Sequence, residues 1–183
     1  MFSIILLGAL LPFVLGQQMD PAKVCLPDTV QFISFNLDKD EGGVGAIDFK
    51  RQLLGSVTPT RTIVQDLAAK KAYVTEPDGS CQASDIADDA VLTQCLPARA
   101  VYVAEASWGF GPNALTEDGW QLPFNGGTLK LLITKQPDQP RYIMLSRFED
   151  CKGEASSSFY INPTLNITQP GILDIPTNCT AVL

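Results

Sequence analysis

The sequence contains no histidine among its 183 residues. Without an imidazole, a Ser-His-Asp triad, a Cys-His nucleophile and a histidine metal site are all excluded. A pair of carboxylates could still hydrolyse glycosides. The acids beside apolar segments are Glu105, Glu117, Asp118, Glu149 and Asp150. Because carboxylates on sheets and turns are usually solvated, we expect no catalytic residue and a protein that is not an enzyme.

Cysteine pairs at the spacing of metal or redox motifs are also missing. The chain has five cysteines, which stand far apart at positions 25, 81, 95, 151 and 179. Zinc, haem and thioredoxin-like sites therefore lack their ligands. In an oxidising compartment, separated cysteines form a disulfide framework. Two intrachain bridges would leave one thiol, either for a partner chain or for burial as a small apolar group.

A long apolar run occurs once, in residues 1–16, MFSIILLGALLPFVLG, which carry no charged side chain. About fifteen apolar residues match a signal-peptide core and fall short of the roughly twenty that span a bilayer. We expect a signal peptide at 1–16, a mature domain at 17–183 and secretion. No Lys or Arg precedes the run, so an uncleaved membrane anchor is the alternative. Secretion would expose Asn166-Ile-Thr and Asn178-Cys-Thr to N-glycosylation.

Positive charge is scarce, with 13 basic against 20 acidic residues and a net charge of −7. This balance argues against a nucleic-acid partner. The segment Asp38-Lys-Asp40-Glu-Gly-Gly begins like a calcium loop, but Phe49 stands where that loop needs a bidentate Glu. We therefore expect no metal site and no cofactor, with weak calcium binding at this acidic turn as the alternative.

The mature chain predicts one all-β domain. Its apolar segments are short, rich in Val, Ile, Phe and Tyr, and bounded by Gly, Pro, Asn or Asp. The expected strands cover 29–36, 46–54, 61–65, 71–75, 100–108, 127–134, 141–148 and 157–161, with a hairpin connection at 38–45. Helix is expected only at 85–92 and 113–119. An antiparallel chain of this size solves its edge problem as a sandwich or a partly closed barrel.

The central stretch resembles the ependymin family. The carrying sequence reads KKAYVTEPDGSCQ and then QCLPARAVYVAEASWGFGPNALTEDGWQL, between residues 70 and 122. A cysteine follows an aromatic strand and turn, and a Pro-x-x-Ala segment then opens a strand that leads to a glycine-rich turn, a Leu-Thr pair and a tryptophan. These positions are Cys81, Pro97, Ala100, Gly109, Gly111, Leu115, Thr116 and Trp120. The spacing is closest to that of invertebrate members.

The resemblance implies a secreted, disulfide-bonded glycoprotein and a homodimer. The implied fold is two stacked, curved antiparallel sheets, a half-barrel or sandwich like that of lipoprotein carriers, with an apolar pocket and one or two short helices. The implied bridges are Cys25 with Cys151 and Cys81 with Cys179, which would leave Cys95 unpaired. A local bridge between Cys81 and Cys95 is the alternative.

The fold analogy and the supply of apolar side chains lead us to expect a carrier that binds a fatty acyl chain or similar lipid. The pocket walls are expected among the aromatic residues Phe32, Phe49, Tyr102, Trp108, Phe110, Trp120 and Tyr142. The alternative is a structural or adhesive protein of the extracellular matrix, calcium-binding and part of a calcified shell. That function would use the acidic surface, the glycans and dimerisation, and it needs no pocket.

Overall fold

A computed structural model describes residues 19–181, so the expected signal peptide at 1–16 lies outside the described residues. The described chain is built from strands and two one-turn 3-10 helices, η1 (Pro21–Lys23) and η2 (Gly111–Asn113). The strands are β1 (Thr29–Asn36), β2 (Glu41–Asp48), β3 (Leu53–Val57), β4 (Thr62–Asp66), β5 (Lys71–Thr75), β6 (Cys81–Asp85), β7 (Val101–Trp108), β8 (Leu115–Phe124), β9 (Gly127–Thr134), β10 (Ile143–Glu149), β11 (Ala155–Thr164) and β12 (Thr180–Ala181).

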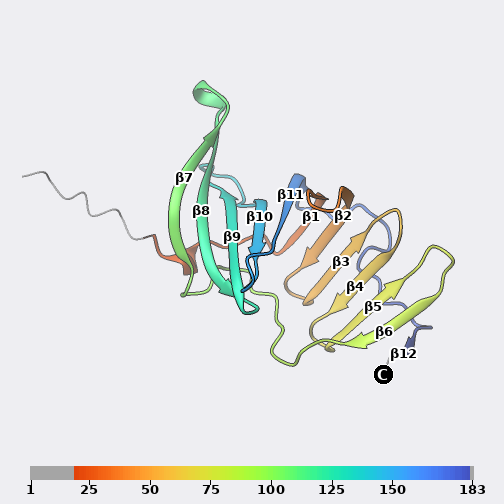
Figure 1. Ribbon diagram of the computed structural model, residues 1–183. Coiled ribbons are helices and arrows are strands. Elements are labelled where there is room, and N and C mark those ends of the chain that lie inside the picture. Colours follow the sequence, from red (N-terminus) through yellow and green to blue (C-terminus); the bar gives the residue numbers. More distant parts are fainter. Residues whose placement is uncertain (1–18, 182–183) are drawn as a thin grey trace, which may run out of the picture.

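The strands form one open, curved sheet with β12 and β7 at its two ends (Figure 1). Its order is β12-β6-β5-β4-β3-β2-β1-β11-β10-β9-β8-β7. This confirms the all-β prediction. The expected two sheets are instead joined, because β1 pairs with β11 and links the meander β1–β6 to the meander β7–β11. We call the pairing of β1 with β11 the central seam.

Turn chemistry explains several of the connections. Asn125 and Gly126 have φ values of 45° and 74° and join β8 to β9 as a two-residue hairpin loop, where a type I′ turn requires positive φ at both positions. The expected connection at 38–45 was too long, since β2 already begins at Glu41. Gly45 lies within that strand opposite Phe32 on β1, and glycine is needed there because a Cβ would overlap the Phe32 ring.

Three further expectations need correction. The strand expected at 46–54 is interrupted by a turn between Asp48 and Leu53, where β2 ends and β3 begins. The helix expected at 85–92 is an irregular segment, and the one expected at 113–119 is mostly β8. Alternation along β8 places the adjacent side chains of Glu117 and Asp118 on opposite faces of the sheet.

The residues that the structure describes cover only one half of each face of the sheet. We call the face that carries Phe32 face 1 and the face that carries Phe35 face 2. An N-terminal strap, residues 19–28, packs on face 1, where Val24 joins a buried cluster with Trp120 and Leu131. A C-terminal cover, residues 165–173, packs on face 2. The strap lies over β8 and β9 on face 1, whereas the C-terminal cover lies over β2 and β3 on face 2. The uncovered apolar areas are therefore in opposite halves of the sheet on its two faces.

The C-terminal cover is fixed by both packing and hydrogen bonds. Its Ile172 and Leu173 form a buried cluster with Ala46 and Leu53 on face 2. The Gln31 side chain on β1 donates to the Thr168 hydroxyl and accepts from the Thr168 backbone N–H. Through these contacts the C-terminal cover shields face 2 of β2 and β3 from solvent.

Candidate functional site

A partly enclosed apolar pocket lies on the uncovered part of face 1, beside the central seam. It has a volume of about 150 Å³. Strands β1, β2, β3, β10 and β11 and the end of the N-terminal strap supply its walls. The lining residues are Leu26, Pro27, Val30, Phe32, Ile47, Leu54, Tyr142, Ile143, Tyr160 and Pro163. We call this the seam pocket.

The walls of the seam pocket carry no charged side chain. Phe32 and Tyr160 meet edge to face across the seam, with ring centroids 5.1 Å apart. The Tyr160 hydroxyl is already engaged, because it lies 2.9 Å from the Ser146 hydroxyl in a hydrogen bond. The pocket therefore offers an uncharged, mainly apolar surface, which suits a hydrocarbon rather than an ionic group.

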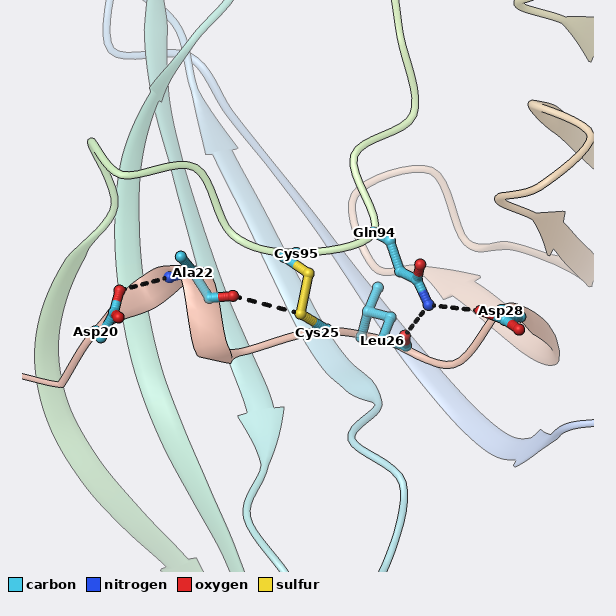
Figure 2. Close-up of a disulfide and its surroundings, with 7 residues drawn as sticks. All are labelled: Asp20, Ala22, Cys25, Leu26, Asp28, Gln94 and Cys95. Atoms are coloured by element: carbon cyan, nitrogen blue, oxygen red, sulfur yellow. Dashed lines mark hydrogen bonds between the residues drawn. A yellow bond between two sulfur atoms is a disulfide. The ribbon is translucent and has the colours of Figure 1, made fainter.

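The rim of the seam pocket is held by a disulfide between Cys25 and Cys95 (Figure 2). Next to it, the Leu26 N–H donates to the Gln94 carbonyl over 2.9 Å. The Gln94 side chain donates to the Leu26 carbonyl over 2.8 Å and to the Asp28 carboxylate over 2.9 Å. Cross-link and hydrogen bonds together fix Leu26, so this wall of the pocket is preorganised.

The disulfide pattern corrects one expected bridge and bears out the other. Cys81 pairs with Cys179, as expected, and ties β6 to the segment that leads into β12. Cys25 pairs with Cys95 rather than with Cys151, which is free and exposed in the turn between β10 and β11. The path of the N-terminal strap explains the difference, because Cys25 lies in the strap beside Cys95, in the segment that connects β6 to β7.

A second apolar pocket lies on face 2, over β7 to β11, with a volume of about 140 Å³. Its lining residues are Trp108, Leu115, Glu117, Leu132, Met144, Leu145, Phe159, Tyr160 and Ile161. Glu117 is its only charged side chain and is 2% exposed. We call this the Glu117 pocket. The Trp108 indole N–H donates to Glu117 Oε2 over 2.7 Å.

Burial and hydrogen bonding act in opposite directions on Glu117. Removal of the carboxylate from water raises its pKa above the usual value, and the smaller effect of the Trp108 hydrogen bond lowers it. Burial dominates, so the Glu117 pocket combines apolar walls with a carboxyl group whose charged form is disfavoured.

The other acids considered for catalysis are held in ion pairs or turns. Asp118 is fully buried on face 1, 3.1 Å from Arg141 and 3.4 Å from Lys135. Lys135 also contacts Glu105 at 2.8 Å, and this hydrogen bond raises the pKa of Lys135. Glu149 lies 3.9 Å from Lys130. The acids considered for glycoside hydrolysis are thus not placed together in either pocket.

The seven aromatic residues proposed as pocket walls fall into three groups. Phe32 and Tyr142 line the seam pocket, and Trp108 lines the Glu117 pocket. Phe49, Tyr102 and Trp120 belong to or pack against the core; Trp120 is 1% exposed and meets Tyr102 edge to face. Phe110 is 98% exposed between β7 and β8 and lines neither pocket.

Most walls of the seam pocket were missed because they are aliphatic or lie in loops. Strand alternation places Val30 and Phe32 on one face of β1, and Ile47 is the β2 partner of Val30 on that face. Leu26, Pro27 and Pro163 carry no periodic signal, since their positions depend on the strap and on the end of β11.

Within residues 19–181, no group of three or more His, Cys, Asp or Glu side chains is arranged to hold a metal ion. In the acidic turn at 38–41, the Asp38 carboxylate accepts a hydrogen bond from the Ser157 N–H over 2.6 Å. Asn166 and Asn178, the expected glycosylation positions, are both exposed. No helix of the described chain has the length and apolar character needed to cross a membrane.

The fold and its two apolar pockets define the class: a disulfide-bonded all-β protein built on one open, curved sheet. No protein-family model matches the chain, and no curated protein is found to be similar. A solved structure with the same fold is that of an uncharacterized conserved protein from Thermus thermophilus. The two chains share 14% identity with a TM-score of 0.57, over 89% of this chain and 94% of that one.

Proposed function

We propose that this protein is a secreted, non-enzymatic glycoprotein that carries an apolar ligand, a fatty acyl chain or similar lipid, in the seam pocket. The observation that carries the proposal is a partly enclosed, uncharged pocket at the centre of the sheet, with its rim cross-linked by Cys25 and Cys95. A preorganised apolar wall lowers the cost of ordering on binding and thus favours a hydrocarbon ligand.

The size of the pocket sets the expected affinity. A cavity of about 150 Å³ accommodates a benzene-sized apolar group. Each methylene removed from water contributes about 0.8 kcal/mol, which corresponds to roughly a fourfold gain in affinity. A longer acyl chain would extend out through the mouth, so affinity should rise with chain length and then level off.

The first test is mass spectrometry of an organic extract of the folded, secreted protein, compared with the same preparation after unfolding and washing. Lipid in stoichiometric amount only in the folded sample would support a carrier and identify its ligand class. Its absence from a folded, dimeric protein would contradict the proposal and favour the extracellular-matrix alternative, for which calcium-dependent aggregation is the next measurement.

A second test uses uncharged alcohols of increasing chain length, which compete with a neutral fluorescent probe such as N-phenyl-1-naphthylamine. Leu54→Trp fills the seam pocket from β3 and should abolish competition. Leu145→Trp, a matched control on face 2, should leave it unchanged. Equal loss in both variants, or loss in neither, would show that the probe binds elsewhere.

Membership of the ependymin family is part of this proposal and rests on the motif between residues 70 and 122. Glycosylation at Asn166 and Asn178 is consistent with their exposure and with the oxidised cysteine pairs. A homodimer is proposed on the same resemblance, and sedimentation of the secreted protein tests it.

A further inference from the structure

The Glu117 pocket differs from the seam pocket in one chemical respect. Both are apolar and similar in volume, but only the Glu117 pocket has a carboxyl group in its lining. They also lie on opposite faces of the sheet, so one ligand cannot fill both. The Glu117 pocket is therefore a separate site, and its ligand is independent of the function proposed above.

The Glu117 carboxylate is only partly satisfied by the protein. Oε2 accepts the Trp108 indole N–H, whereas none of the described residues donates a hydrogen bond to Oε1. The residue is 2% exposed and lines the pocket. Oε1 is not fully sealed from solvent, so a donor or a cation can reach it through the mouth of the pocket and offset part of the desolvation of the carboxylate.

The charged residues around the pocket indicate which chemical group of a ligand would suit Glu117. No basic side chain is in its lining. Two basic residues on face 2, Lys130 on β9 and Arg147 on β10, form the next cross-strand pair on this face beyond Leu132 and Leu145. Lys130 already lies 3.9 Å from Glu149. An anionic head group would meet Glu117 without a counter-charge, whereas an ammonium group would complement it.

The walls suit an alkyl chain attached to such a head group. Leu132, Leu145 and Phe159 are cross-strand neighbours on β9, β10 and β11 and form a continuous apolar track. Trp108 at 54% and Ile161 at 47% exposure leave the apolar surface open to solvent. Phe35 extends the same face onto β1 across the central seam.

We propose that the Glu117 pocket is a second binding site, for an amphiphile with a protonated amine, in which Glu117 Oε1 receives the ammonium group and the apolar track on β9 to β11 receives the alkyl chain. A positively charged amine in the pocket would also favour the charged form of Glu117 and so oppose the rise in its pKa that burial causes.

The test compares octylamine, 1-octanol and octanoate by calorimetry, at concentrations below those at which they aggregate. Octylamine should bind tightest, and octanoate should bind at least about tenfold more weakly, because a charge-assisted hydrogen bond is replaced by repulsion. Trp108 supplies an internal readout, since octylamine should reduce its quenching by iodide. Trp120 is buried and contributes a constant background.

Two variants locate the site. Glu117→Gln keeps the side-chain shape and an acceptor for Trp108 but removes the charge, so octylamine affinity should fall about tenfold or more. Glu105→Gln, the same change on the neighbouring strand but on face 1, should have no effect. Leu54→Trp, which fills the seam pocket, should also leave octylamine binding intact.

Several results would overturn the proposal. They are equal binding of octanoate and octylamine, unchanged octylamine affinity in a folded Glu117→Gln protein, or Trp108 already shielded from iodide by a second copy of the chain. Failure of Leu54→Trp to affect neutral probes would count against the seam pocket alone, so the two proposals fail separately.

Discussion

Glu117 and Asp118 are adjacent in the chain but lie in different electrostatic environments. Strand alternation sends Asp118 to face 1, where Arg141 and Lys135 surround it, and Glu117 to face 2, among apolar side chains. The same type of acidic group at neighbouring positions is thus paired with cations in one case and desolvated in the other.

The environment of Glu117 predicts a pH-dependent stability. Its folded-state pKa is raised by burial, so its charged form destabilises the folded chain as pH rises above the unfolded-state pKa. Glu117→Gln removes this effect. We expect the variant to gain stability relative to the natural chain between about pH 4.3, the ordinary pKa of Glu, and neutral pH. Urea unfolding at several pH values measures the difference.

The control for this prediction is Glu154→Gln, at an exposed position in the turn before β11. The same amide substitution there should leave the shape of the stability profile unchanged. A stability difference for Glu117→Gln that stays constant from acid to neutral pH would contradict the raised pKa.

Gly55 marks the closest approach between the sheet and the C-terminal cover. A Cβ at this position would overlap the carbonyl oxygen of Ile172. Because that neighbour is backbone in a buried cluster, Gly55→Ala should destabilise the chain by about 1–3 kcal/mol. Gly42→Ala is the matched control, since the tightest contact of its Cβ would be the partly exposed ring of Phe35, at 3.2 Å, with the Ser34 carbonyl oxygen at an ordinary 3.6 Å. Chemical denaturation of both variants should show a loss for Gly55→Ala alone.

At the scale of elements, sequence patterns located strands with regular alternation best. β1, β5 and β9 have the predicted bounds, because their β-branched and aromatic residues end at clear turn signals. β6 was missed because Cys81–Asp85 is polar and lies near one end of the sheet. Alternation also assigns side chains to faces, but it does not show which half of a face the strap or the C-terminal cover occupies.

Because alternation does not show which half of a face is covered, only some of the aromatic residues predicted to line a pocket do so. Phe32 and Tyr142 were placed in a pocket by their type, yet Trp120 has the same character and is sealed under the N-terminal strap. The pairing of Cys25 with Cys95 fixes the strap there, and cysteine spacing alone left the pairing open.

The disulfides are tested by peptide mapping without reduction. Peptides joining Cys25 to Cys95 and Cys81 to Cys179 are expected, with Cys151 alkylated in the native protein. A peptide joining Cys25 to Cys151, or Cys81 to Cys95, would contradict this pattern.

Removal of the bridge between Cys81 and Cys179 should be costly. It joins positions 98 residues apart, and the chain-entropy model gives about 4–5 kcal/mol for a loop of that length. The double substitution of both cysteines by serine should lower the free energy of unfolding by up to this amount in urea titrations. Cys151→Ser, at an exposed thiol, should change it little.

At the scale of the whole molecule, protection should decline from the middle of the sheet to its ends. β1 has hydrogen-bonded neighbours on both sides, whereas β7 has one and β12 is two residues long. Native-state hydrogen exchange should therefore be slowest in β1, β2 and β11 and fastest in β12 and on the outer edge of β7. Uniform exchange across the sheet would contradict this gradient.

The central seam has a consequence for synthesis of the chain. β1 is translated early, but Ser156 on β11, whose hydroxyl accepts a hydrogen bond from the Asn36 side chain, follows 120 residues later. At about 5–20 residues per second the ribosome needs roughly 6–24 s for that length, while hairpins form in microseconds. Each nascent chain therefore passes through a stage in which β2–β6 can pair but one edge of β1 stays open, and protection of that edge by a chaperone would favour its correct closure.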